Sequence, residues 1–288
     1  MFPRLFSIEW RKLSGRMLLW GEMAVLAVLI LAIHIALMAV LAQPQGHDLP
    51  PEALEAMRDA MRWPQGLLNA FTFVNGGELG GLFAVVLAAA LVAQEYPWRT
   101  VHVWLSRGVA RGSYLLAKAA ALAAALGLLV LTALLTGGIV TGAYTLHTLG
   151  QLPWGELPWG EMVRGFLVAW ITLLPYASLT VFVAVLTRST LIATGVGLGY
   201  SLLVENLAVE VLLLASPDLA RVARFLPSLL ANAALNFVEH GAEFQAGVAQ
   251  TTQFELVEPG LACALLLGYA LFGLGAAWWA FRRQDITG

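Results

Sequence analysis

The sequence predicts an all-α integral membrane protein with six transmembrane helices, an N-terminal interfacial elbow helix and both termini in the cytoplasm. The chain is 59% hydrophobic and only 12% charged, whereas soluble domains carry about a quarter charged residues. Uncharged runs recur that meet or approach the roughly 20 residues a helix needs to cross the hydrocarbon core. These runs are continuous and rich in alanine and leucine, without the alternation that β-barrel strands show. We therefore expect a single transmembrane domain over residues 1–288.

Residues 1–19 are expected to form a cytoplasmic interfacial helix. Apolar side chains such as Leu5 and Trp10 are interspersed with basic ones, which is typical of a helix lying flat among lipid headgroups. A solvated basic tail is the alternative. The uncharged run that follows, Met23–His47, has 25 residues, longer than the roughly 7–15 of a secretory signal. We therefore expect a retained first span over 20–42.

Five further spans are expected, at 70–94, 115–141, 163–187, 190–213 and 259–281. The uncharged run Ala119–Gly155 is long enough for more than one helix. Three glycines and then two prolines favour one long helix followed by a loop; they are Gly137, Gly138, Gly142, Pro153 and Pro158. Residues 214–258 form the largest external segment, and its apolar stretch RFLPSLLANAALNFV is expected to be partly re-entrant.

The distribution of basic residues sets the predicted orientation. With six spans, 11 of the 16 lysines and arginines fall on the side that holds both termini. The positive-inside rule assigns that side to the cytoplasm. These residues are Arg4, Arg11, Lys12, Arg16, Arg99, Arg107, Arg111, Lys118, Arg188, Arg282 and Arg283.

Motifs for enzymatic and metal chemistry are absent from the sequence. The single cysteine excludes a disulfide framework and a cysteine-based zinc site, and the five histidines form no HxxxH or HExxH pattern. There is no GxxxxGK[ST] phosphate loop and no GxSxG nucleophile elbow. With a net charge of −2, the chain has no basic domain for nucleic acid. We expect no catalytic residues, no metal and no cofactor bound by this chain.

A few polar residues within or beside the predicted spans are candidates for a translocation path or gate. Glu78 and Glu205 each lie about 24 Å from the cytoplasmic edge, near the outer boundary of a core about 30 Å thick. Acidic residues inside a membrane are energetically costly and usually functional, but this cost falls near the interface. The two glutamates are therefore either part of an outer gate or substrate contact, or ordinary interfacial residues that reach headgroup water. His34 is mid-span, as either a histidine satisfied by a neighbouring hydroxyl or a proton relay. The full set of path candidates is Asn75, Glu78, Tyr200, Glu205 and Asn206.

The cytoplasmic segment after the second span carries a pattern of charged and hydroxyl residues. In order these are Glu95, Thr100, Ser106, Arg107, Arg111 and Lys118, and the chain ends in the basic sequence FRRQDI followed by two residues. Together with the six spans and the elbow helix, the pattern resembles the permease subunits of the type-2 ATP-binding-cassette (ABC-2) exporters. The sequence departs from the family pattern at Arg99, Gly108 and Ala110.

The resemblance implies a membrane-spanning permease subunit of an ABC exporter in the bacterial or archaeal cytoplasmic membrane. It implies a separate ATPase subunit that binds ATP and Mg, and a second permease chain, either identical or a similar paralogue. Residues 95–113 would form a cytoplasmic coupling segment that docks on the ATPase. The positions expected to serve that contact are Glu95, Trp98, Arg99, Thr100, Trp104, Ser106, Arg107, Arg111 and Lys118. The alternative is a positive-inside loop that only fixes topology.

Two other functions remain open from the sequence. An intramembrane enzyme would use Glu78, Glu205 and His34, although their predicted depths differ. An ion-coupled secondary transporter would have interrupted helices at the midplane and an internal repeat, neither of which the sequence shows. The sequence does not name a substrate.

Overall fold

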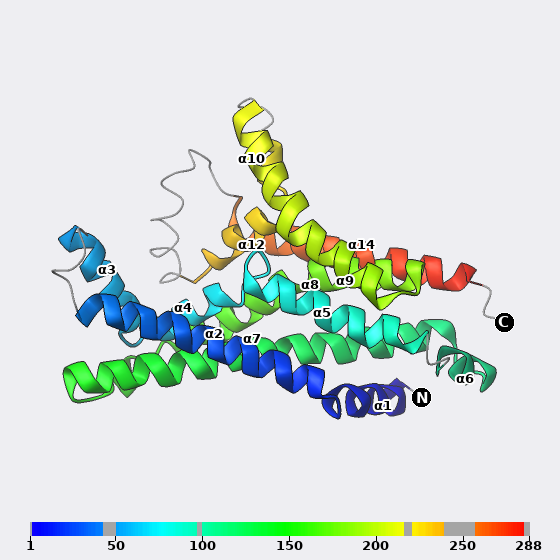
Figure 1. The fold of residues 1–288 in the computed structure, drawn as a ribbon, viewed down its shortest axis with the longest axis horizontal. Coiled ribbons are helices and arrows are strands. Elements are labelled where there is room, and N and C mark those ends of the chain that lie inside the picture. The colour runs from blue at the N-terminus through cyan, green and yellow to red at the C-terminus, as the bar shows by residue number, and fades with distance from the viewer. Residues whose placement is uncertain (1, 43–49, 97–99, 216–220, 239–256, 285–288) are drawn as a thin grey trace.

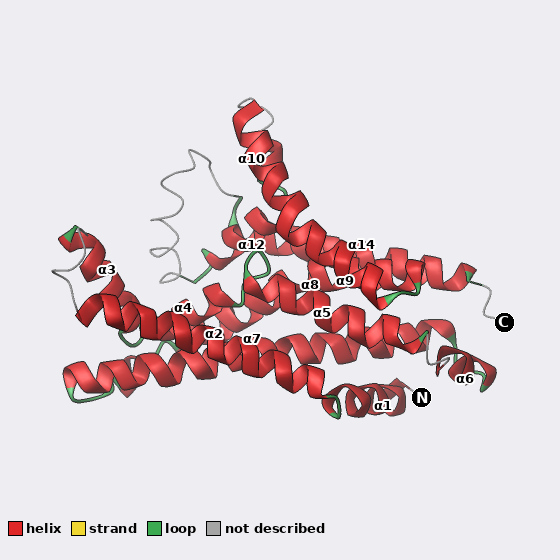
Figure 2. Cartoon of the chain, in the orientation of Figure 1, coloured by secondary structure: helices red, strands yellow, loops and turns green. Residues whose placement is uncertain are grey.

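The described part of the chain consists of helices and connecting loops, without strands (Figures 1 and 2). The computed structural model describes residues 2–42, 50–96, 100–215, 221–238 and 257–284. Within these ranges, five helical segments are long and apolar enough to cross a membrane. They are Met17–Ala42, Arg111–Leu149, Trp159–Thr187, Thr190–Leu212 and Pro259–Arg283. The predicted multi-pass, all-helical membrane protein is confirmed at this level.

The predicted second span is broken into two helices. Helix α3 (Pro51–Met61) leads into α4 (Gln65–Phe73), and α5 (Leu79–Val92) follows with a 3-10 turn, η2 (Ala93–Glu95). The break coincides with the sequence Asn75-Gly76-Gly77, and glycine is a poor helix former. The backbone N–H of Gly76 donates to Thr172 Oγ1 over 2.9 Å. Helix α5 alone is shorter than the other five segments, so the continuous helix expected over 70–94 is wrong.

Helix α7 (Arg111–Leu149) is longer at both ends than the predicted 115–141. Its glycines lie inside the helix rather than at its end, because side chains of neighbouring segments pack closely against them. A Cβ on Gly137 would lie 2.5 Å from the Ala70 Cβ, and one on Gly142 would lie 3.0 Å from the Trp63 ring. Small residues that let helices approach closely are the usual device of membrane helix packing. The helix ends instead at Gly150, which adopts φ +73°.

Helix α8 (Trp159–Thr187) lies at the centre of the molecule and is the most buried of the five segments. It packs against α5, α9 (Thr190–Gly199) and α14 (Pro259–Arg283), while α7 packs against α1 (Phe2–Ser14), α2 (Met17–Ala42) and α4. The 3-10 turn η3 (Trp154–Glu156) joins α7 to α8. Both chain ends lie at the same end of the bundle as the short helix α6 (Thr100–Ser106), whereas α3 lies at the other end (Figure 1).

The fifth predicted span contains an irregular turn. Helix α9 continues through a π-helical turn, η4 (Tyr200–Val204), into α10 (Glu205–Ala215), which projects away from the bundle (Figure 1). Helix α12 (Pro227–Leu235) packs against α8 and α14. It forms part of the apolar stretch expected within the external segment 214–258. Residues 216–220 and 239–256 of that segment lie outside the described residues.

Candidate functional site

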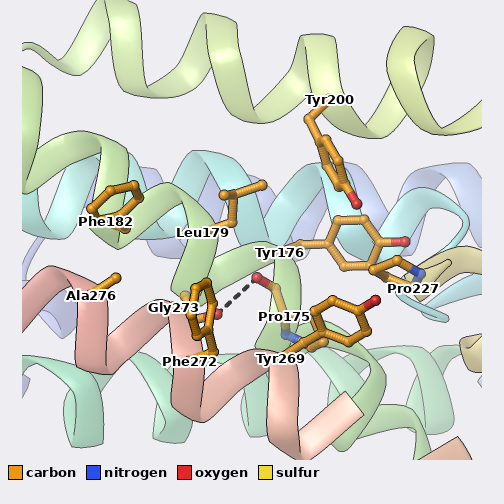
Figure 3. Close-up of a pocket in the computed structure, with 11 residues that line it drawn as sticks. Pro175, Tyr176, Leu179, Phe182, Tyr200, Pro227, Tyr269, Phe272, Gly273 and Ala276 are labelled. Carbon is orange, nitrogen blue, oxygen red and sulfur yellow. Dashed lines mark hydrogen bonds between the residues drawn. The ribbon is translucent and has the colours of Figure 1, made fainter. Parts of the chain in front are cut away.

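A pocket of about 280 Å³ lies between α8, the π-helical turn, α12 and α14 (Figure 3). We call it the tyrosine pocket because three tyrosines from three different elements contribute to its wall. The lining residues are Pro175, Tyr176, Ser178, Leu179, Phe182, Tyr200, Pro227, Tyr269, Phe272, Gly273 and Ala276. π-Helical turns are rare and frequently occur at functional sites, and here such a turn begins at Tyr200.

The tyrosine pocket has a polar end and an apolar end (Figure 3). The hydroxyl groups of Tyr176, Tyr200 and Tyr269 lie toward Pro227, and Phe182 lies at the opposite end. The hydroxyl of Tyr269 donates to the Phe225 carbonyl over 3.1 Å. The pocket is therefore amphipathic, although all its walls come from membrane-type helices or α12.

Glu205 lies behind the polar end of the pocket and is 2% exposed. Its Oε2 accepts a hydrogen bond from the Tyr176 hydroxyl over 2.9 Å, and its Oε1 accepts one from the Ser228 N–H over 2.5 Å. A buried acid of this kind is costly unless its oxygens are hydrogen-bonded. The two bonds join α10 to α8 and α12 at the position where the π-helical turn ends.

The predicted path residues are partly brought together. Asn75 is fully buried and its amide donates to Asn232 Oδ1 on α12 over 2.7 Å. Tyr200 lines the pocket, and Glu205 supports it from behind. Glu78 is exposed and lies close enough to Tyr176 for an electrostatic interaction. Asn206 is exposed, and its amide donates to the Leu202 carbonyl in the π-helical turn over 2.9 Å.

Sequence reasoning missed three polar residues of this region: Tyr176, Tyr269 and Asn232. Each is a polar residue inside an otherwise apolar stretch, and Tyr176 follows Pro175 within α8. Polar side chains at such positions are a usable signal. What the sequence does not give is the packing that puts α8, α12 and α14 around one cavity.

A second polar site lies at the end of the bundle that holds both termini. It consists of Glu9 and Lys12 on α1, Glu95 on η2 and Lys118 on α7, and we call it the charge cluster. Lys118 Nζ lies 2.6 Å from Glu9 Oε2 and 2.8 Å from Glu95 Oε1. Lys12 Nζ lies 2.7 Å from Glu9 Oε1 and 3.0 Å from Glu95 Oε1. Tyr114 on α7 also donates its hydroxyl to Glu95.

The charge cluster is electrically balanced, and all of its members except the partly exposed Lys12 are buried. Glu95 is 1% and Lys118 2% exposed, and two acids face two bases. Burial lowers the pKa of Lys12, but the hydrogen bond with Glu9 and the charge of Glu95 raise it by more, so it lies above its ordinary value. Sequence reasoning missed Glu9. Its signal was the four-residue spacing with Leu5 and Leu13, which puts it on the buried face of α1.

The residues expected to meet an ATPase divide into two groups. Glu95 and Lys118 are buried in the charge cluster, and the Arg111 guanidinium donates to the carbonyls of Phe281 and Arg282 at the end of α14. The same guanidinium reaches the Gln284 carbonyl as well. These three side chains therefore hold the molecule's own helices together.

The rest of the segment centres on α6. Thr100 Oγ1 donates to the Glu95 carbonyl over 3.3 Å, and the Lys12 ammonium lies 5.3 Å from the centroid of the Trp104 ring. Ser106 and Arg107 are exposed. Trp98 and Arg99 lie outside the described residues.

Two further buried polar side chains sit within α2. His34 Nδ1 lies 2.7 Å from the Ile30 carbonyl, and its ring lies 5.6 Å from that of Phe73. Its partner is thus a backbone carbonyl rather than the expected hydroxyl, and the structure does not bring it to the partners of Glu205. Glu22 is buried and both its carboxylate oxygens lack a hydrogen-bond partner among the described residues. Sequence reasoning did not single it out.

No cluster of three or more histidine, cysteine, aspartate or glutamate side chains that could hold a metal ion is found within the described ranges. Comparison with curated proteins yields no match. A family model does match, over residues 66–287, and this range includes α5, α6 and every element of the tyrosine pocket. Because the match covers most of the chain, the protein belongs to the family described as Protein of unknown function (DUF2705).

Proposed function

We propose that this chain is the membrane-spanning permease subunit of an ABC exporter, which moves its substrate using ATP hydrolysed by a separate nucleotide-binding subunit. The observation that supports this most is the form of the motif-bearing segment. Its middle is a short helix, α6, at the end of the bundle where both termini lie. Val103 and Ser106 on this helix and Arg107, which directly follows it, are exposed.

In this proposal α4 and α5 together form the second of six spans, and α1 is the interfacial elbow helix. The excess of lysine and arginine at the end with α1 and α6 favours a cytoplasmic position for both termini. The partners are the lipid bilayer, the ATPase subunit and a second permease chain, identical or paralogous. The setting is the cytoplasmic membrane of a bacterium or archaeon.

The contacts of α6 offer a route from the ATPase to the spans. Thr100 bonds the Glu95 carbonyl, Trp104 contacts Lys12 of the charge cluster, and Arg111 binds the end of α14. When the ATPase subunits close on ATP, a displaced α6 would carry α1, α5, α7 and α14 with it. Such coupled rigid-body shifts are an established form of switching between two states.

The test is co-expression and co-purification with a candidate ATPase subunit. Val103→Asp alters an exposed side chain of α6, and Arg107→Glu alters the exposed residue that follows it. For both variants we expect loss of association and of stimulated ATPase activity with an unchanged folded permease. Arg58→Glu, a charge reversal on α3 at the other end of the bundle, is the matched control. Full association and stimulation by both α6 variants would refute the docking role of this helix.

A second candidate, an ion-coupled secondary transporter, is favoured by one observation. Interrupted helices form the ion sites of many such transporters, and here α4–α5 and α9–α10 are both interrupted. The interruptions approach the same helix, since Asn75 bonds Asn232 and Glu205 bonds Ser228, both on α12. Transport into sealed proteoliposomes separates the two functions. The exporter needs ATP and its ATPase subunit, whereas the alternative runs on an ion gradient with the permease alone.

A further inference from the structure

The polar end of the tyrosine pocket holds three tyrosine hydroxyl groups. Tyr176 donates its hydroxyl hydrogen to Glu205, and Tyr269 donates its own to the Phe225 carbonyl. A tyrosine hydroxyl has a single hydrogen to give, so both oxygens present only lone pairs to a ligand. Tyr200 contributes a third hydroxyl at the same end, without a hydrogen-bond partner among the described residues (Figure 3).

Two acidic side chains lie near this end. Glu205 accepts a hydrogen bond from Tyr176 directly, and Glu78 lies close enough to Tyr176 for an electrostatic interaction. The five ion pairs found in the described chain leave Glu205 without a lysine or arginine partner. An anionic group at this position would face two oriented lone pairs with the Glu205 carboxyl group behind them, whereas a cationic group would be attracted by these oxygens.

The walls of the pocket add to this preference. Aromatic faces attract cations, and the attraction is stronger where water is excluded. Tyr176, Tyr200 and Tyr269 surround the polar end, while Phe182 and Phe272 offer an apolar surface beyond it (Figure 3). The volume of about 280 Å³ is close to the lower bound for small-molecule sites. It suits one ring with a compact charged head and is too small for a large amphiphile.

We propose that the tyrosine pocket binds a small organic cation whose ammonium-type head lies among the three tyrosines and whose apolar body lies against Phe182. Its role as the substrate site rests on the proposed export function, whereas the binding itself does not. Glu205 supplies the compensating negative charge through Tyr176, and the exposed rings of Tyr269 and Phe272 form the rim.

The experiment compares two probes of nearly equal shape, benzyltrimethylammonium and its uncharged carbon isostere neopentylbenzene. Binding to the purified permease, without any ATPase subunit, is measured by calorimetry and by the ligand-dependent rise in unfolding temperature. We expect saturable binding of the cation and at least about tenfold weaker binding of the isostere, because the positive charge of the ammonium head strengthens its interaction with the tyrosine oxygens of the pocket.

Three variants locate the site. Glu205→Gln keeps the shape of the side chain but removes its charge. The affinity for the cation should therefore fall about tenfold, and the affinity for the isostere should not change. Tyr200→Phe removes a hydroxyl that has no partner in the described structure, so the fold is kept and cation binding should fall about threefold. Ala276→Phe fills the apolar end and should abolish binding. Ala143→Phe adds the same ring on α7, in a different pocket, and should have no effect.

The possible outcomes separate this inference from the proposed function. Equal binding of both probes, or cation binding that survives Ala276→Phe, overturns the cation site. If the permease binds the cation but associates with no ATPase, the cation site is supported and the proposed exporter function is refuted. If the permease associates with an ATPase and transports with ATP, but neither binds the cation nor has its transport inhibited by it, the exporter proposal stands and the cation site is refuted.

Discussion

Replacing Lys118 by methionine should loosen the attachment of α1 to the bundle. The change removes one of two cations from the charge cluster and leaves the buried carboxylates of Glu9 and Glu95 with Lys12 alone. Breaking a buried ion pair by removing one partner costs about 3–5 kcal/mol, since the remaining charge stays buried without compensation. At about 2–4 °C for each kcal/mol, we expect an unfolding temperature lower by roughly 6–20 °C.

The assay is thermal unfolding of the detergent-solubilised protein followed by size-exclusion chromatography. Arg107→Met removes a cation of similar length from an exposed position directly after α6, and surface changes of this kind fall within about 0.5 kcal/mol. Adding Glu9→Gln to Lys118→Met should restore part of the loss, because the excess buried negative charge is then removed. An unfolding temperature for Lys118→Met equal to that of Arg107→Met would show that the charge cluster does not secure α1.

The break between α4 and α5 supplies two further predictions. Gly76→Ala should lower stability by about 1–3 kcal/mol, as overpacked sites do, because its Cβ would collide with the Thr172 carbonyl. Gly275→Ala places its Cβ in open space within α14, so in the same unfolding assay its stability should equal or exceed that of the wild type. Asn75→Ala and Asn232→Ala should each destabilise, and their double-mutant cycle should give a coupling of about 0.6–1.7 kcal/mol, as found for membrane hydrogen bonds. Strict additivity would mean that the 2.7 Å bond between them contributes nothing.

The membrane-type helices were predictable because length without charge is a property of the sequence itself. The predicted spans 20–42, 163–187 and 259–281 fall inside α2, α8 and α14. The break at Gly76 had a local signal in Asn75-Gly76-Gly77, but the apolar residues on both sides outweighed it. In α7 the error was the opposite. Gly137 and Gly142 looked like a helix end, and only the neighbouring helix shows why they belong inside.

The candidate sites were predictable only in part, because each is assembled from distant segments. The motif positions Glu95 and Lys118 were found, but Glu9, which lies 109 residues before Lys118, became part of the charge cluster only through packing of α1 on α7. For the same reason Tyr200 was singled out and Tyr269 was not. A tyrosine in an apolar helix becomes part of a binding site only if it lines a cavity. This cavity forms only when α8, α12 and α14 pack together.

The charge balance of the charge cluster restricts which substitutions the protein can tolerate during evolution. No single member can be replaced by an apolar residue without stranding a buried charge of the opposite sign. Substitutions at Glu9, Lys12, Glu95 and Lys118 should therefore arise in compensating pairs, one acid together with one base. Relatives that carry this N-terminal helix should either keep all four charges or lack a matched acid and base, which makes these positions a covariation signature for the attachment of the helix.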